Sequence, residues 1–157
     1  GLGYIGPRVR RIVNSARFPV LITSPVFKKW RSIAVFFGGS ANAINALKLA
    51  FRLSRASEMP LSVYTHMENV SRESYEEIIK NENLEEEMDR YVTEWHMFES
   101  GKFEENIYDV PHDALVVMGA YGHSLIRNIF FGGKMEKIQS TITNNLLIAG
   151  PNYTLTR

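Results

Sequence analysis

Cysteine is absent from all 157 residues of the chain, which excludes disulfides, thiolate metal sites and cysteine nucleophiles. Long apolar runs are also lacking, since stretches such as Ile33 to Phe37 and Ala114 to Met118 are too short to cross a membrane. There is little excess charge of either sign, and a net charge of +1 gives no support for a nucleic-acid partner. Gly1 to Arg11 shows no signal-peptide pattern, so we expect a cytoplasmic protein with no membrane partner.

The hydrophobic content of 45% and the charged content of 22% are typical of a globular α/β protein. Short apolar runs bounded by glycine or proline indicate buried parallel strands. We predict five of them, at residues 33–37, 61–66, 93–98, 114–118 and 145–149. Helical spacing of apolar residues separates these runs, so the sequence predicts a five-stranded parallel sheet with helices on both faces, a Rossmann-like α/β fold.

The predicted helices begin at serine caps or at glycine. Ser40 is positioned to cap a helix that buries Ile44, Leu47, Ala50 and Phe51. Ser71 is positioned to cap a helical stretch over residues 72–92, which the Asn-Glu-Asn run at 81–83 is expected to break in two. Shorter helices are predicted at residues 103–108 and 135–143.

The opening segment repeats the end of the chain. Tyr4 to Pro25 aligns without a gap with Phe130 to Pro151, and both segments have the order glycine, amphipathic helix, apolar strand, proline. Five identities support the alignment: Gly6, Ile12, Leu21, Ile22 and Pro25 match Gly132, Ile138, Leu147, Ile148 and Pro151. We therefore expect residues 1–25 to be the last helix and strand of a preceding repeat, 26–31 to be a linker, and 32–157 to be a complete second domain.

Glycine loops follow two of the predicted strands, where ligands bind in parallel sheets. Gly38-Gly39 follows the first strand, Gly119-Ala-Tyr-Gly122 follows the fourth, and Gly132-Gly133 opens the last predicted helix. Glycine lets backbone N–H groups approach an anion, and a helix N-terminus favours phosphate. The alternative interpretation is that each glycine only satisfies the geometry of its turn.

As a set, the spacing Gly119-x2-Gly122-x9-Gly132-Gly133 after an apolar strand resembles the signature of the universal stress protein family. Gly38-Gly39-Ser40 is similar to the family's Asp-Gly-Ser after its first strand, and Thr65-His-Met67 to the end of its second. The resemblance covers nearly the whole chain and implies an adenine nucleotide α-hydrolase-like fold. The opening segment resembles the end of a preceding family domain, as in tandem members.

In one branch of that family the resemblance implies an ATP site. Carried over by position, it would place Gly119, Gly122, Gly132 and Gly133 at the phosphates. Gly38 would lie near the ribose, and the Met67 backbone near the base. Two departures stand out, because Gly38 replaces the family's aspartate and Gly133 its serine or threonine. Each loses a polar contact of about 1–3 kcal/mol, so ATP binding is expected to be weak or lost.

Other chemistries fit poorly. The P-loop pattern fails at Asn128 and Met135, and the four histidines have no metal-ligand spacing, which gives no metal site. No nucleophile–base or carboxylate pair accompanies the glycine loops, so no catalytic residues are assigned. The leading hypothesis is a non-catalytic stress-response regulatory module with a regulatory protein partner. Its alternatives are an interaction-only dimerisation module without ligand and a slow ATP hydrolase.

The opening strand is expected to pair with another strand, because alone it would expose unpaired amides and aliphatic side chains. Family domains resemble one another in pairing antiparallel through their fifth strands. We therefore predict that Val20 to Thr23 lies antiparallel beside Asn145 to Ala149, either as an intrachain pseudo-dimer or across a homodimer. Packing of the opening helix is expected to bury Val9, Ile12 and Val13 and to leave Arg8 and Arg11 in solvent.

Overall fold

The computed structural model describes residues 7–23, 28–99, 109–120 and 144–155. The elements run in the order α1 (Pro7–Ser15), β1 (Val20–Ile22), β2 (Ser32–Phe36), α2 (Ala41–Ser57), β3 (Leu61–His66), α3 (Arg72–Asn81), α4 (Glu85–Tyr91), β4 (Val92–Phe98), β5 (Ala114–Gly119) and β6 (Leu146–Ala149). The five strands predicted for the complete domain are present within one residue of their expected ends. The break predicted between two helices at residues 81–83 is also present. The helices predicted at 103–108 and 135–143 lie outside the described residues.

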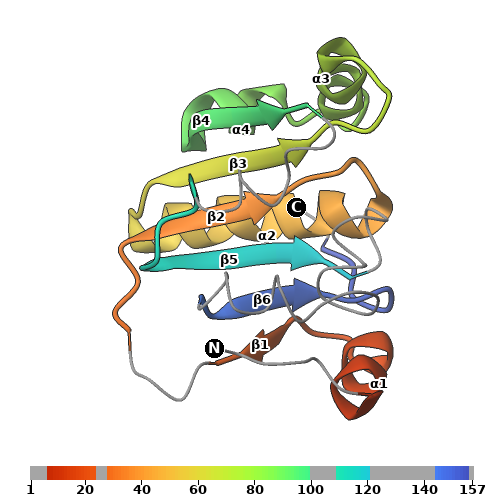
Figure 1. Ribbon diagram of the computed structural model, residues 1–157, viewed down its shortest axis with the longest axis vertical. Helices are drawn as coiled ribbons and strands as arrows, with labels where there is room; N and C mark the ends of the chain where they lie inside the picture. Colours follow the sequence, from red (N-terminus) through yellow and green to blue (C-terminus); the bar gives the residue numbers. More distant parts are fainter. Residues whose placement is uncertain (1–6, 24–27, 100–108, 121–143, 156–157) are drawn as a thin grey trace.

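The strands form one sheet in the order β1-β6-β5-β2-β3-β4 (Figure 1). Strands β2 to β6 are mutually parallel, whereas β1 pairs antiparallel with β6 at the sheet edge. The predicted α/β class is confirmed, with a sixth strand added to the expected five. The β1 ladder joins Val20 to Ile148 and Ile22 to Leu146, so the antiparallel pairing predicted for these segments is present within the chain.

The central strands are buried on both faces, as continuous apolar runs predict. Ile33 and Val35 of β2 belong to the apolar cluster that α2 and α4 cover. Ala34 and Phe36, which point the other way, pack in a second cluster to which α1 contributes Val13. Figure 1 shows α2 lying across the face of the sheet behind β2 and β5.

Helix α2 begins at the predicted cap. The Ala43 amide donates to the Ser40 hydroxyl oxygen over 3.1 Å, and the buried side of the helix includes all four predicted residues. The helix ends at Ser57, and Glu58 caps it with a left-handed backbone (φ 62°) while its amide donates to the Ser54 carbonyl over 2.8 Å. Ser71 also precedes its helix, but its hydroxyl contacts the Ser74 hydroxyl instead of a backbone amide, so the predicted side-chain cap is absent there.

The buried face of helix α1 differs from the prediction at one residue. Val13 is fully buried and Val9 is partly buried, but Ile12 is 53% exposed, so the prediction for Ile12 was wrong. A Cβ on Gly150 would overlap the Val13 carbonyl oxygen, which means that the chain after β6 packs directly on the Val13 turn. This contact centres the buried stripe on Val13 and Ala16 and turns Ile12 outward, about 100° around the helix. Arg8 and Arg11 are exposed, as predicted.

Candidate functional site

The described candidate residues meet at the edge formed by the carboxyl ends of the parallel strands. Phe36 of β2 is in register with Tyr64 of β3 and with Met118 of β5. Gly38, Met67 and Gly119 follow those residues within three positions, so the sheet brings them to one edge, here called the carboxyl edge. Gly122, Gly132 and Gly133, the remaining residues predicted to bind phosphate, lie outside the described residues.

The loop after β2 has a conformational reason for glycine at position 39. Gly39 has φ +89°, and a Cβ there would lie 2.8 Å from Ile78 Cδ1 of α3. A side chain at this position would be strained and crowded at the same time. The Ser40 hydroxyl and carbonyl accept from the Ala43 and Ile44 amides, so these groups close the start of α2.

Gly119 packs directly on the first turn of α2. A Cβ on Gly119 would overlap the Asn42 carbonyl carbon and would lie 2.6 Å from the Ala43 nitrogen. Next to it, Asn42 Nδ2 donates to the Ala120 carbonyl over 2.6 Å. The Ala120 amide donates to Ala149 over 2.8 Å, so both backbone polar groups of Ala120 are used inside the fold.

Asn42 was not predicted at this edge, although its place in the first turn of a helix that follows a glycine loop was a usable signal. A side-chain amide there can reach a neighbouring strand end.

Met67 is tied into the sheet at its amide. The Met67 N–H donates to the Phe98 carbonyl over 2.7 Å, which extends the β3–β4 pairing beyond His66. Beside it, Trp95 Nε1 donates to Thr65 Oγ1 over 2.8 Å, and Thr65 Oγ1 donates to the Phe37 carbonyl over 2.7 Å. This relay joins the ends of β4, β3 and β2 through one buried hydroxyl. It was not predicted, because its members are far apart in sequence.

An aromatic stack lies on the opposite face of β3 and β4. The Tyr64 ring stacks on His96 with centroids 4.7 Å apart, and His96 Nε2 lies 3.0 Å from Glu94 Oε2. Burial, followed by the negative charges of Asp109 and Glu94, raises the pKa of Tyr64 above its ordinary value. Among the described residues, no group of three acidic, histidine or cysteine side chains is arranged to hold a metal ion.

The carboxyl edge therefore presents mainly backbone. The Met67 amide, the Thr65 hydroxyl and both backbone polar groups of Ala120 already form hydrogen bonds within the fold. Gly38, Met67 and Gly119 bring no charged side chain to this edge. Backbone amides in such an arrangement can cradle an anion. His66, the titratable residue that ends β3 at this edge, is buried with 3% exposure. No helix within the described residues is long and apolar enough to cross a membrane.

The fold and this edge define a Rossmann-like α/β domain, and comparisons place it among known proteins. No family model matches the chain. Universal stress protein Slr1230 of Synechocystis is 24% identical over 146 residues, which is 87% of this chain and 48% of that protein.

Two solved structures show the same fold. A universal stress protein from Archaeoglobus fulgidus is 14% identical with a TM-score of 0.59, and the match covers 88% of this chain and 52% of that one. A universal stress protein in complex with cAMP is 16% identical with a TM-score of 0.53 over 78% of this chain and 98% of that one. The predicted resemblance is confirmed: this chain is similar to the universal stress proteins in sequence and in fold. It spans about half the length of the Synechocystis and Archaeoglobus proteins.

Proposed function

We propose that this chain is a non-catalytic cytoplasmic regulatory module of the universal stress protein type, with weak or lost ATP binding. The observation that carries the proposal is that polar groups at the carboxyl edge already form hydrogen bonds within the fold. The Met67 amide and both backbone groups of Ala120 bond within the fold, and Gly38 has no carboxylate to offer a ribose. A nucleotide would therefore depend on the remaining backbone amides of the glycine loops.

An adenine nucleotide is the ligand class that the proposal names. The universal stress protein with the same fold that is in complex with cAMP supports an adenine nucleotide as the ligand class. The two missing polar side chains at Gly38 and Gly133 weaken the contacts with ribose and phosphate by about 1–3 kcal/mol each. We expect ATP to bind more weakly than about 1 µM, a Kd near which binding free energies reach −8 kcal/mol.

Isothermal titration calorimetry with ATP tests this proposal. The double variant Gly38→Asp with Gly133→Ser is expected to tighten ATP binding by about tenfold or more, because it restores both polar contacts. Gly38→Asn with Gly133→Ala is the matched control, which adds similar bulk without the carboxylate and hydroxyl and should give no gain. Submicromolar affinity in the original chain would contradict the claim of weak binding.

The interaction-only alternative is favoured by a different observation. Around β1, large apolar side chains are exposed: Ile12 by 53%, Phe18 by 66% and Leu21 by 43%. Because β1 already pairs with β6, the β6 edge is occupied within the chain, as a pseudo-dimer would require. A further protein, whether a regulatory partner or a second copy in a homodimer, would meet β1 instead. No ATP gain in the restored variant, together with concentration-dependent association in sedimentation velocity, would favour this alternative.

A slow ATP hydrolase remains the other alternative. Phosphate release from ATP that exceeds buffer alone, and that survives in independently purified preparations, would contradict the non-catalytic proposal. We expect none, because the Gly38, Met67 and Gly119 positions bring no general base to the edge.

A further inference from the structure

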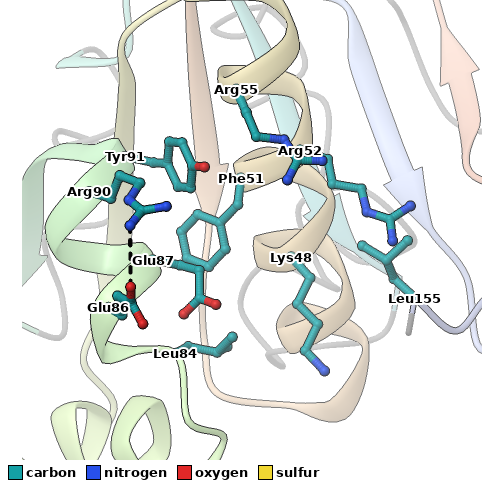
Figure 2. Close-up of a pocket in the computed structure, with 10 residues that line it drawn as sticks. All are labelled: Lys48, Phe51, Arg52, Arg55, Leu84, Glu86, Glu87, Arg90, Tyr91 and Leu155. Atoms are coloured by element: carbon teal, nitrogen blue, oxygen red, sulfur yellow. Dashed lines mark hydrogen bonds and ion pairs between the residues drawn. The ribbon is translucent and has the colours of Figure 1, made fainter. Parts of the chain in front are cut away.

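A cavity of about 340 Å³ lies between α2, α4 and the C-terminal residues, on the helical face of the domain (Figure 2). Its lining residues are Lys48, Phe51, Arg52, Arg55, Leu84, Glu86, Glu87, Arg90, Tyr91 and Leu155. Asn45 holds the C-terminal residues against α2, since its Nδ2 donates to the Tyr153 carbonyl over 2.9 Å. From Asn42 at the carboxyl edge to Arg55, α2 rises about 20 Å, so this is a different site.

The floor of the cavity is apolar and aromatic. Phe51, Leu84 and Leu155 are each less than 10% exposed. The Phe51 and Tyr91 rings come from α2 and α4, with centroids 6.0 Å apart and planes tilted by 32°. The volume is at the small end for ligand pockets, about 300–1,000 Å³, so the floor suits a single ring.

The rim of the cavity carries an excess of positive charge. Lys48, Arg52 and Arg55 are spaced four and three residues apart, which places them on one face of α2. Within the described part of the chain, no carboxylate lies within 4.0 Å of Lys48 or Arg55. On the opposite wall Arg90 pairs with Glu86 over 3.2 Å, so its charge is already balanced. The α2 side therefore offers cations to an anionic ligand.

One acceptor accompanies these cations. Glu87 Oε2 is buried, and no donor among the described residues hydrogen-bonds to it. Figure 2 shows the Glu87 side chain projecting from α4 into the space between α4 and α2. A buried acceptor without a partner is costly. Glu87 also lines the cavity, so rotation about the terminal bond of its carboxylate would bring this oxygen to a ligand hydroxyl.

We propose that this cavity binds a small aromatic carboxylic acid that carries a hydroxyl group. The ring packs on Phe51 and Tyr91, the carboxylate lies between the charges of Lys48 and Arg55, and the hydroxyl donates to Glu87. Cationic donors at a rim and an apolar floor together select an amphipathic anion over a neutral aromatic molecule. The site is independent of the nucleotide proposal, because it uses none of the residues of the carboxyl edge.

The test is an NMR titration of the full chain with 4-hydroxyphenylacetate as the probe. We expect saturable shifts at Phe51, Leu84 and Leu155 and a Kd of about 1 mM, which suits a ligand of this size. The neutral analogue 4-hydroxyphenylacetamide is expected to bind about tenfold more weakly, because it lacks the charge. Equal affinity for acid and amide, no saturable shift, or shifts confined to the carboxyl edge would overturn the proposal.

Variants separate the roles of the residues. Lys48→Gln and Arg55→Gln are each expected to weaken binding of the acid by about fivefold, while Arg72→Gln on α3, outside the cavity, should leave it unchanged. Phenylacetate, which lacks the hydroxyl, should bind the original chain about threefold more weakly than the probe does. The Glu87→Ala variant should bind phenylacetate and the probe with equal affinity. Unchanged affinity in both cation variants would refute the assigned charge contacts, and dispersed amide spectra establish that each variant is folded.

Discussion

Gly119 and Ala43 lie so close together that a Cβ built on Gly119 would be 2.6 Å from the Ala43 amide nitrogen. The contact fixes the start of α2 against the end of β5, between elements 76 residues apart in sequence. It gives Gly119 a packing role that does not depend on phosphate. The absence of a side chain at this position is needed by the fold whether or not a ligand binds.

Gly119→Ala is therefore expected to destabilise the protein by about 2 kcal/mol or more, because the methyl group must push α2 away from the sheet. Urea denaturation measures the change. Gly38→Ala is the control, because Gly39 is the glycine with positive φ in that loop, and it should cost less. Equal midpoints for Gly119→Ala and the original chain would show that the packing role is wrong.

The Trp95–Thr65–Phe37 relay gives a second prediction. Thr65→Val keeps the shape of the side chain but removes the acceptor for Trp95 Nε1 and the donor to the Phe37 carbonyl. We expect a loss of about 1–3 kcal/mol, because the partly buried Trp95 indole and the Phe37 carbonyl both lose their partner. Thr93→Val at an exposed position of β4 is the matched control. The Trp95 indole proton should also shift upfield in the NMR spectrum, and an unchanged shift would argue against the hydrogen bond.

Adjacent residues of α1 test how the opening helix packs. Val13→Ala removes buried methyl groups beneath the chain after β6, and we expect it to cost about 2 kcal/mol. Ile12→Ala removes a larger side chain that is 53% exposed, and it is expected to stay within about 0.5 kcal/mol of the original. Chemical denaturation of both variants measures the change in the free energy of unfolding. A loss at Ile12 as large as that at Val13 would mean that both side chains are buried, as the sequence predicted.

Tyr64 should make stability fall at alkaline pH. Burial and the charges of Asp109 and Glu94 raise its pKa above 10.0 in the folded protein, while the unfolded chain releases the proton near 10.0. Above pH 10 the folded state therefore binds more protons, so the free energy of unfolding decreases as pH rises through the folded pKa. Below that range the contribution is fully present. The free energy of unfolding is measured by denaturation of the original chain and of Tyr64→Phe at a series of pH values through this range. The difference between the two isolates the effect of Tyr64, and an equal dependence on pH in both proteins would contradict it.

Local patterns in the sequence were sufficient for the strands and for the cap of α2. Apolar runs such as Ile33 to Phe37 identify buried strands because a parallel sheet covered on both faces needs apolar side chains on both. Ser40 identified the start of α2 because a hydroxyl there can accept from an amide three residues on. The pairing of Val20 to Ile22 with another strand was expected from the cost of an open strand, and β6 was expected as its partner from the resemblance to family domains that pair through their fifth strands.

The buried face of α1 and the role of Gly119 needed the tertiary structure. Helical spacing predicted that Ile12 and Val13 both face inward, and the contact of Gly150 with Val13 turns Ile12 outward. A glycine that follows a strand suits an anion as well as a close helix, and the position of Asn42 and Ala43 assigns Gly119 to packing. The sequence by itself determined the elements and their order, because these depend on local spacing. Tertiary structure decided which faces meet and which polar groups are used, because those contacts join residues far apart in the chain.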